Sequence, residues 1–142
     1  MPAIYAHWLL GEKTLESSKI KEKDLILKNR KAFNLGLQGP DFMYFKDKGT
    51  DEEVSGFAGK LHNMPASYAL TEFSKTYKAS GNSASLAYIL GFIGHFALDT
   101  NCHWYVYKVV DEDEVNHDEL ETEFDRFLMM KEGLRPAKVK VE

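Results

Sequence analysis

The longest apolar segment of the chain lies between Lys78 and Lys108, where Asp99 is the only carboxylate and no Lys or Arg occurs. Its length would suffice to cross a bilayer. Ser, Asn, Thr, Asp and His residues interrupt its apolar runs, however, so we expect a buried helix from about residue 84 to 110 and no membrane span. Gly81-Asn82-Ser83 directly before it is typical of a helix N-cap.

The other apolar positions indicate further helices separated by polar turns, giving four or five in all. No repeat and no Gly/Ser/Pro-rich linker divides the sequence, so we expect one all-α domain over residues 1–142. Residues 33–41 are predicted to form a turn-rich loop, because Gly36, Gly39 and Pro40 favour turns. The remaining helices are predicted at 14–31 with Thr14 as N-cap, at 54–63, at 66–78 beyond Pro65, and at 111–133 opened by the acidic run Asp111 to Glu114.

Charge and cysteine content narrow the classes of protein. The 18 Lys and Arg against 22 Asp and Glu give a net charge of −4, which argues against stable nucleic-acid binding because phosphate neutralisation needs a basic surplus. The basic residues between 19 and 31 alternate with acids and indicate a solvated helix face. A single cysteine, Cys102, and no signal-like N-terminal segment predict a cytoplasmic location.

Three ionisable residues share one face of the predicted central helix. His95, Asp99 and His103 are spaced i, i+4 and i+8, so steps of about 100° place them within about 80° of one another. Burying such groups without partners costs several kcal/mol, whereas metal coordination removes the penalty. Two core histidines beside a hydrogen-bonded Asp are the alternative, but the stacked trio favours a metal site.

The last predicted helix carries a second polar pair on its apolar face. His117 and Glu121 are one turn apart and share a stripe with Phe124 and Leu128. His-x-x-x-Glu at this spacing is a bidentate arrangement for zinc. A buried His117–Glu121 hydrogen bond is the alternative interpretation.

The order of these residues resembles that of the zinc-dependent phospholipase C family. The shared elements are His7, Gln38-Gly39-Pro40-Asp41, His62, Gly94-His95-Phe96-Ala97-Leu98-Asp99 with His103, and His117-x-x-x-Glu121. All five histidines fall on ligand positions of the pattern. The resemblance implies a compact multi-helix bundle, a fold shared with the trinuclear-zinc nucleases. Family members usually have more helices after the Glu121 helix, so the chain is expected to be a fragment truncated at the C-terminus or a short relative whose site is open or completed in a homo-oligomer.

The resemblance also implies two or three bound zinc ions, with other divalent transition metals as alternatives. In secreted members the N-terminal amine completes the coordination of the third ion. If Met1 is removed here, the secondary amine of Pro2 could be that ligand. Asp41 is additionally the family position credited with general-base catalysis. The implied ligand sets are Asp41, His62, His95 and Asp99 for one ion, His103, His117 and Glu121 for a second, and His7 with Asp99 for a third.

The expected function is metal-dependent hydrolysis of a phosphodiester, on a phospholipid head group or a similar small-molecule phosphoester. Zinc would supply the positive field at the phosphate, which suits an acidic chain. Two alternatives remain: a trinuclear-zinc single-strand nuclease, and a non-catalytic metal-binding scaffold. Aromatic residues near the ligand positions, such as Tyr44 and Tyr107, could line a choline-like pocket, although core packing explains most of them equally well.

Overall fold

The computed structural model describes residues 4–17, 19–45, 52–113 and 115–136. The regular secondary structure of these residues consists of helices, which confirms the predicted all-α fold. The elements are α1 (Ile4–Glu16), α2 (Lys23–Lys28), α3 (Arg30–Leu37), the 3₁₀ helix η1 (Asp41–Phe45), α4 (Glu52–Asn63), α5 (Ala66–Ser80), α6 (Ser83–Asp113) and α7 (His117–Lys131).

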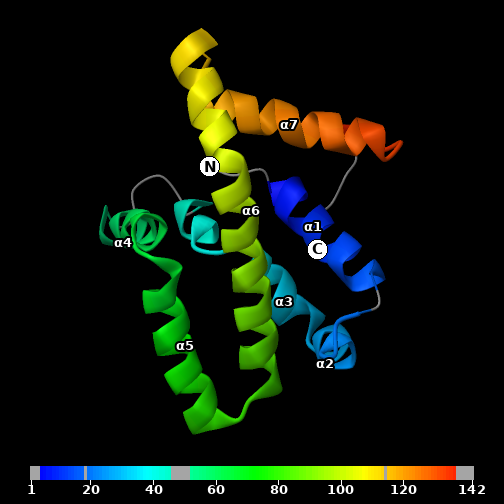
Figure 1. Cartoon of the computed structure of the whole chain (residues 1–142), viewed down its shortest axis with the longest axis vertical. Helices are drawn as coiled ribbons and strands as arrows, with labels where there is room; N and C mark the ends of the chain where they lie inside the picture. The colour runs from blue at the N-terminus through cyan, green and yellow to red at the C-terminus, as the bar shows by residue number, and fades with distance from the viewer. Residues whose placement is uncertain (1–3, 18, 46–51, 114, 137–142) are drawn as a thin grey trace.

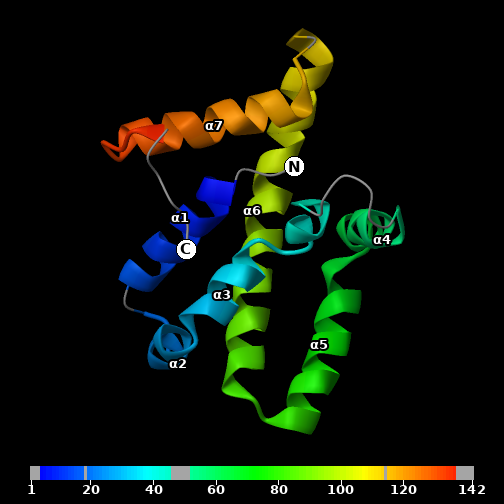
Figure 2. The same ribbon diagram turned by 180° about the vertical axis from the view of Figure 1, so that it is seen from behind.

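Helix α6 is the central element of the fold. Figure 1 shows it running the length of the molecule, with α5 beside its first half and α7 crossing near its end. Seen from behind in Figure 2, α3 crosses the other side of α6, and α1 and α2 lie next to α3. None of the described helices combines the length and apolar content that a membrane span requires.

The crossing of α3 and α6 depends on two glycines that let the backbones touch. A Cβ atom on Gly36 would lie 2.2 Å from the Tyr88 carbonyl oxygen, and one on Gly91 would lie 2.2 Å from the Phe33 carbonyl oxygen. Apolar side chains fill the space around this contact. The core cluster consists of Leu15, Ile26, Phe33, Leu37 and Ala87.

Several predicted boundaries are confirmed. Helices α4, α5 and α6 extend the predicted ranges 54–63, 66–78 and 84–110 by a few residues. Gly81 ends α5 with a positive φ of 60°. Asn82 Oδ1 then accepts the Ala84 N–H at 2.9 Å, so this pair separates α5 from α6 as the sequence indicates.

Other predictions about the helices are wrong. The segment 14–31 is not one helix, because Thr14 lies inside α1 and Asn29 separates α2 from α3 with φ −121° and ψ 37°. The Asn29 side chain donates to the Leu25 carbonyl at 2.9 Å, which satisfies the end of α2 locally. The described part of the chain contains seven α-helices rather than four or five.

The predicted loop at 33–41 and the predicted start of the last helix are also wrong. Residues 33–37 belong to α3, and the chain turns only from Gln38 to Pro40. The acidic residues 111–113 end α6. Helix α7 begins at His117, where Asn116 Oδ1 accepts the Asp118 N–H at 2.9 Å and provides the N-cap.

A long-range contact fixes the start of α1. The Asp125 carboxylate on α7 accepts the N–H groups of Tyr5 and Ala6, each at 2.8 Å. First-turn N–H groups have no partner within a helix, and a carboxylate there is favoured by the helix dipole. Asp125 therefore caps α1 from 120 residues away.

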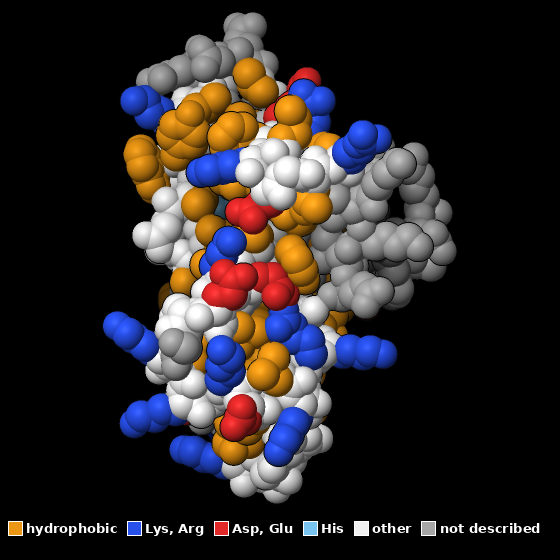
Figure 3. Space-filling model, turned by 90° about the vertical axis from the view of Figure 1, so that its right-hand side faces the viewer, with side chains coloured by type: hydrophobic (Ala, Val, Ile, Leu, Met, Phe, Trp, Pro, Cys, Tyr) orange, Lys and Arg blue, Asp and Glu red, His pale blue; other side chains and the backbone are white. Residues whose placement is uncertain are grey.

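The surface shown in Figure 3 is divided by side-chain type. Hydrophobic side chains gather over its upper half, and most of the Lys and Arg side chains extend around its lower half. Most of the acidic side chains in this view lie along the middle, with others near the top and the bottom.

Candidate metal centre

The structure brings all eight predicted ligands together although they come from five elements. They are His7 on α1, Asp41 on η1, His62 on α4, His95, Asp99 and His103 on α6, and His117 and Glu121 on α7. Three groups have donor atoms within 4.8 Å of one another: His7 with His95 and Asp99; Asp41 with His62 and His95; and His103 with His117 and Glu121. The assignment of individual residues to particular ions stays a prediction.

Asp99 is the centre of the first group. Its Oδ2 lies 3.2 Å from His95 Nε2 and its Oδ1 lies 3.3 Å from His7 Nε2. The His7 and His95 rings stack with centroids 4.5 Å apart. Burial alone would raise the pKa of the Asp99 carboxyl, but the adjacent His7 and His95 imidazoles lower that pKa well below its usual range. Asp99 is therefore a carboxylate.

A tight turn places Asp41 against His62 and His95. Gly39 in this turn has φ +55°, and a Cβ atom there would lie 2.2 Å from the His95 ring, so only glycine fits. Asp41 is 1% exposed. Its Oδ1 lies 2.7 Å from His62 Nε2 and its Oδ2 lies 3.8 Å from His95 Nδ1.

The third group joins α6 to α7. Glu121 Oε1 lies 3.0 Å from His117 Nε2 and 3.5 Å from His103 Nε2. Burial raises the pKa of the Glu121 carboxyl above its ordinary value, and the nearby His117 opposes this only in part. The predicted alternative, a His117–Glu121 hydrogen bond, is compatible with the 3.0 Å distance, but His103 adds a third donor at the same place.

Backbone carbonyls orient three of the imidazole rings. His62 Nδ1 lies 2.8 Å from the Ala58 carbonyl oxygen, His103 Nδ1 lies 3.1 Å from that of Asp99, and His95 Nδ1 lies 3.3 Å from that of Leu37. A neutral ring that donates from Nδ1 carries a lone pair on Nε2. In each case Nε2 is directed toward a carboxylate and is the nitrogen left available to a metal ion.

The His62–Asp41 contact follows from this tautomer. A neutral His62 presents a lone pair to a carboxylate oxygen at 2.7 Å, so a proton or a metal ion is needed between them. Burial lowers the pKa of His62, but the contacts with Asp41 and the Ala58 carbonyl outweigh it and raise the pKa. His62 and Asp41 together thus attract a cation.

Buried atoms without hydrogen bonds provide a test of whether a metal fits. Among the described residues, both Asp41 carboxylate oxygens and His95 Nε2 are buried and have no hydrogen-bond partner. Such atoms are rare in folded proteins, and a bound ion is one explanation. Imidazole nitrogens and carboxylate oxygens are also the donors that zinc accepts. The residues present therefore fit zinc.

Comparison with known proteins gives the family. A family model described as zinc dependent phospholipase C matches residues 6–142. The chain belongs to the zinc-dependent phospholipase C family. This confirms the resemblance and supports zinc as the metal. Neither a curated protein nor a solved structure matches the chain.

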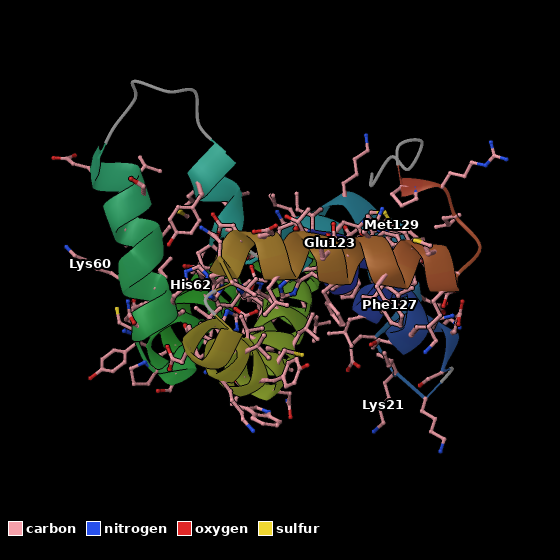
Figure 4. The ribbon with its side chains drawn as sticks, turned by 90° about the horizontal axis from the view of Figure 1, so that it is seen from above. Lys21, Lys60, His62, Glu123, Phe127 and Met129 are labelled. Carbon is pink, nitrogen blue, oxygen red and sulfur yellow. The ribbon has the colours of Figure 1, made fainter. Side chains whose placement is uncertain are left out.

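In this zinc-dependent phospholipase C family member, six of the eight predicted ligands line a cleft of about 460 Å³. They are Asp41, His62, Asp99, His103, His117 and Glu121. Figure 4 shows His62 directed from α4 toward α6 and α7, while Lys60 on the same helix extends away from them. Tyr44 stacks beside His62 with ring centroids 5.9 Å apart, and Tyr107 lies 5.4 Å from His103. These two tyrosines line the cleft. A choline-like ligand beside them stays a prediction.

Sequence reasoning missed two polar residues of the cleft, Asn63 and Asp118. Asp118 is on the first turn of α7 directly after His117. An acidic residue at a helix start, next to the predicted ligand His117, was the signal that could have indicated Asp118. Asn63 directly follows His62 as the last residue of α4, where an Asn is common for reasons of helix termination and so is not by itself a sign of a site.

Proposed function

We propose that this family member hydrolyses the phosphodiester bond of a phospholipid or a similar small phosphoester with the help of bound zinc. The observation that carries the proposal is that every one of the three donor groups contributes to the lining of one cleft. Asp99 comes from the first group, Asp41 and His62 from the second, and the third group lines the cleft with all its members. No Lys or Arg is among the described residues that line this cleft. A phosphate bound there would need positive charge from another source, and metal ions are the source that the donors fit.

The three groups would hold the metal as follows. Asp41, His62 and His95, with Asp99 beside them, hold one ion; His103, His117 and Glu121 hold a second; and His7 with Asp99 contributes to a third. When bound, closely spaced zinc ions acidify a water molecule and neutralise charge on the phosphate oxygens. Other divalent transition metals with the same donor preferences could replace zinc in vitro.

The proposed role of Asp41 is general-base catalysis. Its carboxylate is buried between His62 and His95, so it is held in one place. In the proposed reaction Asp41 takes a proton from the water whose oxygen attacks phosphorus. The bond from phosphorus to the leaving alcohol breaks, and the proton is returned to the leaving oxygen.

The test combines elemental analysis with three substrates. The purified protein is expected to contain zinc and to hydrolyse phosphatidylcholine or a chromogenic phosphodiester, but not single-stranded DNA. Zinc without turnover of any substrate would favour the scaffold alternative, and cleavage of DNA alone would favour the nuclease.

A pair of variants on α4 provides the matched control. His62→Ala removes a proposed ligand, and Lys60→Ala changes a side chain on the same helix that extends away from the site. We expect His62→Ala to lose zinc and about 100-fold or more in rate, because loss of a mere hydrogen-bond partner of a ligand already costs about 10–100-fold. Lys60→Ala should keep both. Equal zinc and rate in the two variants would contradict the proposal.

A further inference from the structure

One side of α7 carries exposed hydrophobic side chains between charged ones. Steps of about 100° per residue place these side chains in a sector of about 120°, whose middle is about 140° away from the inward-facing Glu121 and Asp125. We call this side the outer face of α7, and its members are Glu123, Phe124, Phe127, Met130 and Lys131. Phe127 is 59% exposed, Met130 58% and Phe124 43%.

No described helix covers the outer face. In the view from above, Figure 4 shows α7 on the viewer's side of the molecule, with Phe127 labelled on it. The hydrophobic side chains of Figure 3 gather at the same end of the molecule, where Figure 1 places α7. Single exposed hydrophobic residues are normal on proteins, whereas a group of them on one face indicates contact with another molecule.

The order of residues on the outer face is self-complementary. If two copies of α7 lie antiparallel about a two-fold axis at Phe127, residues at equal distances before and after Phe127 lie opposite each other. Phe124 is then opposite Met130 of the second copy, and Glu123 is opposite Lys131 of the second copy. Apolar groups thus meet apolar groups, and each charge meets its opposite. A parallel pair would instead place Glu123 opposite Glu123, which is unfavourable.

We propose that the outer face of α7 binds a second copy of this chain through an antiparallel, two-fold symmetric pair of α7 helices. A two-fold dimer built on one self-complementary patch is the commonest form of protein oligomer. The inference does not depend on the proposed function, because no member of the outer face is a proposed metal ligand.

The area available is sufficient for a weak dimer. Two copies offer four Phe and two Met side chains, each about half exposed, which gives about 600 Å² of hydrophobic area if each side chain can bury roughly 200 Å². Since hydrophobic atoms form about 60% of a typical interface, the whole contact would bury about 1,000 Å², at the lower limit for specific association. We therefore expect a dissociation constant in the micromolar range.

The charge of α7 favours a second copy over a lipid surface. The helix carries five acidic residues and two basic ones, whereas helices that lie on membranes carry mainly Lys and Arg beside their apolar face. Glu123 already pairs with Arg126 of its own helix at 3.0 Å, and in the dimer it would also face Lys131. Exposed ion pairs add little affinity, so the rings supply the affinity and the charges select the antiparallel direction.

Sedimentation velocity of the purified protein at micromolar concentrations tests the contact. The fraction of dimer should rise with concentration. We expect Phe127→Asp to raise the dissociation constant at least about 30-fold, as for a residue at the centre of an interface. The matched control is Phe57→Asp, which changes a Phe that is 52% exposed on α4 and should leave the dissociation constant unchanged.

A charge exchange tests the antiparallel direction and does not require Phe127→Asp to fold. Glu123→Lys or Lys131→Glu alone places like charges opposite each other and should weaken the dimer at least about fivefold. The double variant restores opposite charges and should return to within about twofold of the unmodified protein. The control is Glu72→Lys on α5, which breaks a similar exposed pair, with Lys75 at 2.6 Å, and should not affect the dimer.

Each remaining outcome overturns the proposal. A protein that is monomeric at every concentration has no such contact, and binding of that monomer to phosphatidylcholine vesicles through Phe127 would identify a lipid surface instead. A dimer that neither Phe127→Asp nor the single charge changes weaken uses another surface. A double variant as weak as the single ones excludes the antiparallel pair. None of these results depends on whether the protein hydrolyses a phosphodiester.

Discussion

Replacing His95 with alanine is the most informative perturbation of the metal centre. His95 is fully buried and belongs to two of the three donor groups. Truncating a large buried ring costs about 3–5 kcal/mol in packing alone. Losing a metal removes a further contribution of about 4 kcal/mol when the free ion is at a thousandfold of its dissociation constant. We therefore expect His95→Ala to be destabilised by roughly 7–9 kcal/mol in zinc.

The control for this experiment is Phe92→Ala, one turn earlier on α6. Phe92 is 1% exposed and packs against Phe73 with ring centroids 4.9 Å apart, so its truncation costs the same packing term of about 3–5 kcal/mol. It offers no ligand atom. Phe92→Ala should keep the zinc content, and its unfolding free energy should still fall when EDTA is added.

The assay is urea unfolding with and without EDTA, together with zinc content by elemental analysis. In His95→Ala the decrease caused by EDTA should be smaller than in the unmodified protein, because part of the metal-linked stability is already lost. A His95→Ala variant with the zinc content and EDTA response of the unmodified protein would refute the metal centre.

Three further predictions follow from individual contacts. Gly39→Ala should weaken zinc binding, measured by competition with a chromogenic chelator. It should also lower the free energy of unfolding by about 1–2 kcal/mol, because its Cβ would meet the His95 ring and its φ is positive. Gly56→Ala, with open space around it, should bind zinc normally. Asp125→Ala should cost about 2 kcal/mol and speed amide exchange at Tyr5 and Ala6, and unchanged exchange would exclude the capping role. Gly36→Ala should lower the free energy of unfolding more than Gly56→Ala does, because a Cβ on Gly36 would meet the backbone of α6, which cannot rotate away. Equal urea midpoints for the two variants would contradict this.

The elements that sequence reasoning found are those whose causes are local. The pairs His95–Asp99 and His117–Glu121 follow from one-turn spacing on a helix. The start of α6 follows from Gly81 and Asn82, whose effects reach only a few residues. Helices α4 and α5 are likewise bounded by nearby residues.

The elements that it missed have distant causes. No residue near position 4 marks the start of α1, because its cap is Asp125. The distances between His7, Asp41 and the α6 residues depend on the contact of Gly36 with Gly91 and on the turn at Gly39, which spacing along the chain does not encode. These residues were assigned by family resemblance. A cavity of about 250 Å³ between α1, α6 and α7 had no sequence signal, since residues of three separate helices line it.

The Asp125 cap has a consequence for how the protein is made. The ribosome releases the His7 region about 120 residues before Asp125, a delay of about 6–24 s at ordinary translation rates of 5–20 residues per second. During that interval the first N–H groups of α1 lack their acceptor. The proposed zinc site also needs His117 and Glu121, so the nascent chain can complete it only after this part of α7 has emerged. A premature stop at residue 124 would leave α1 without its cap and shorten α7.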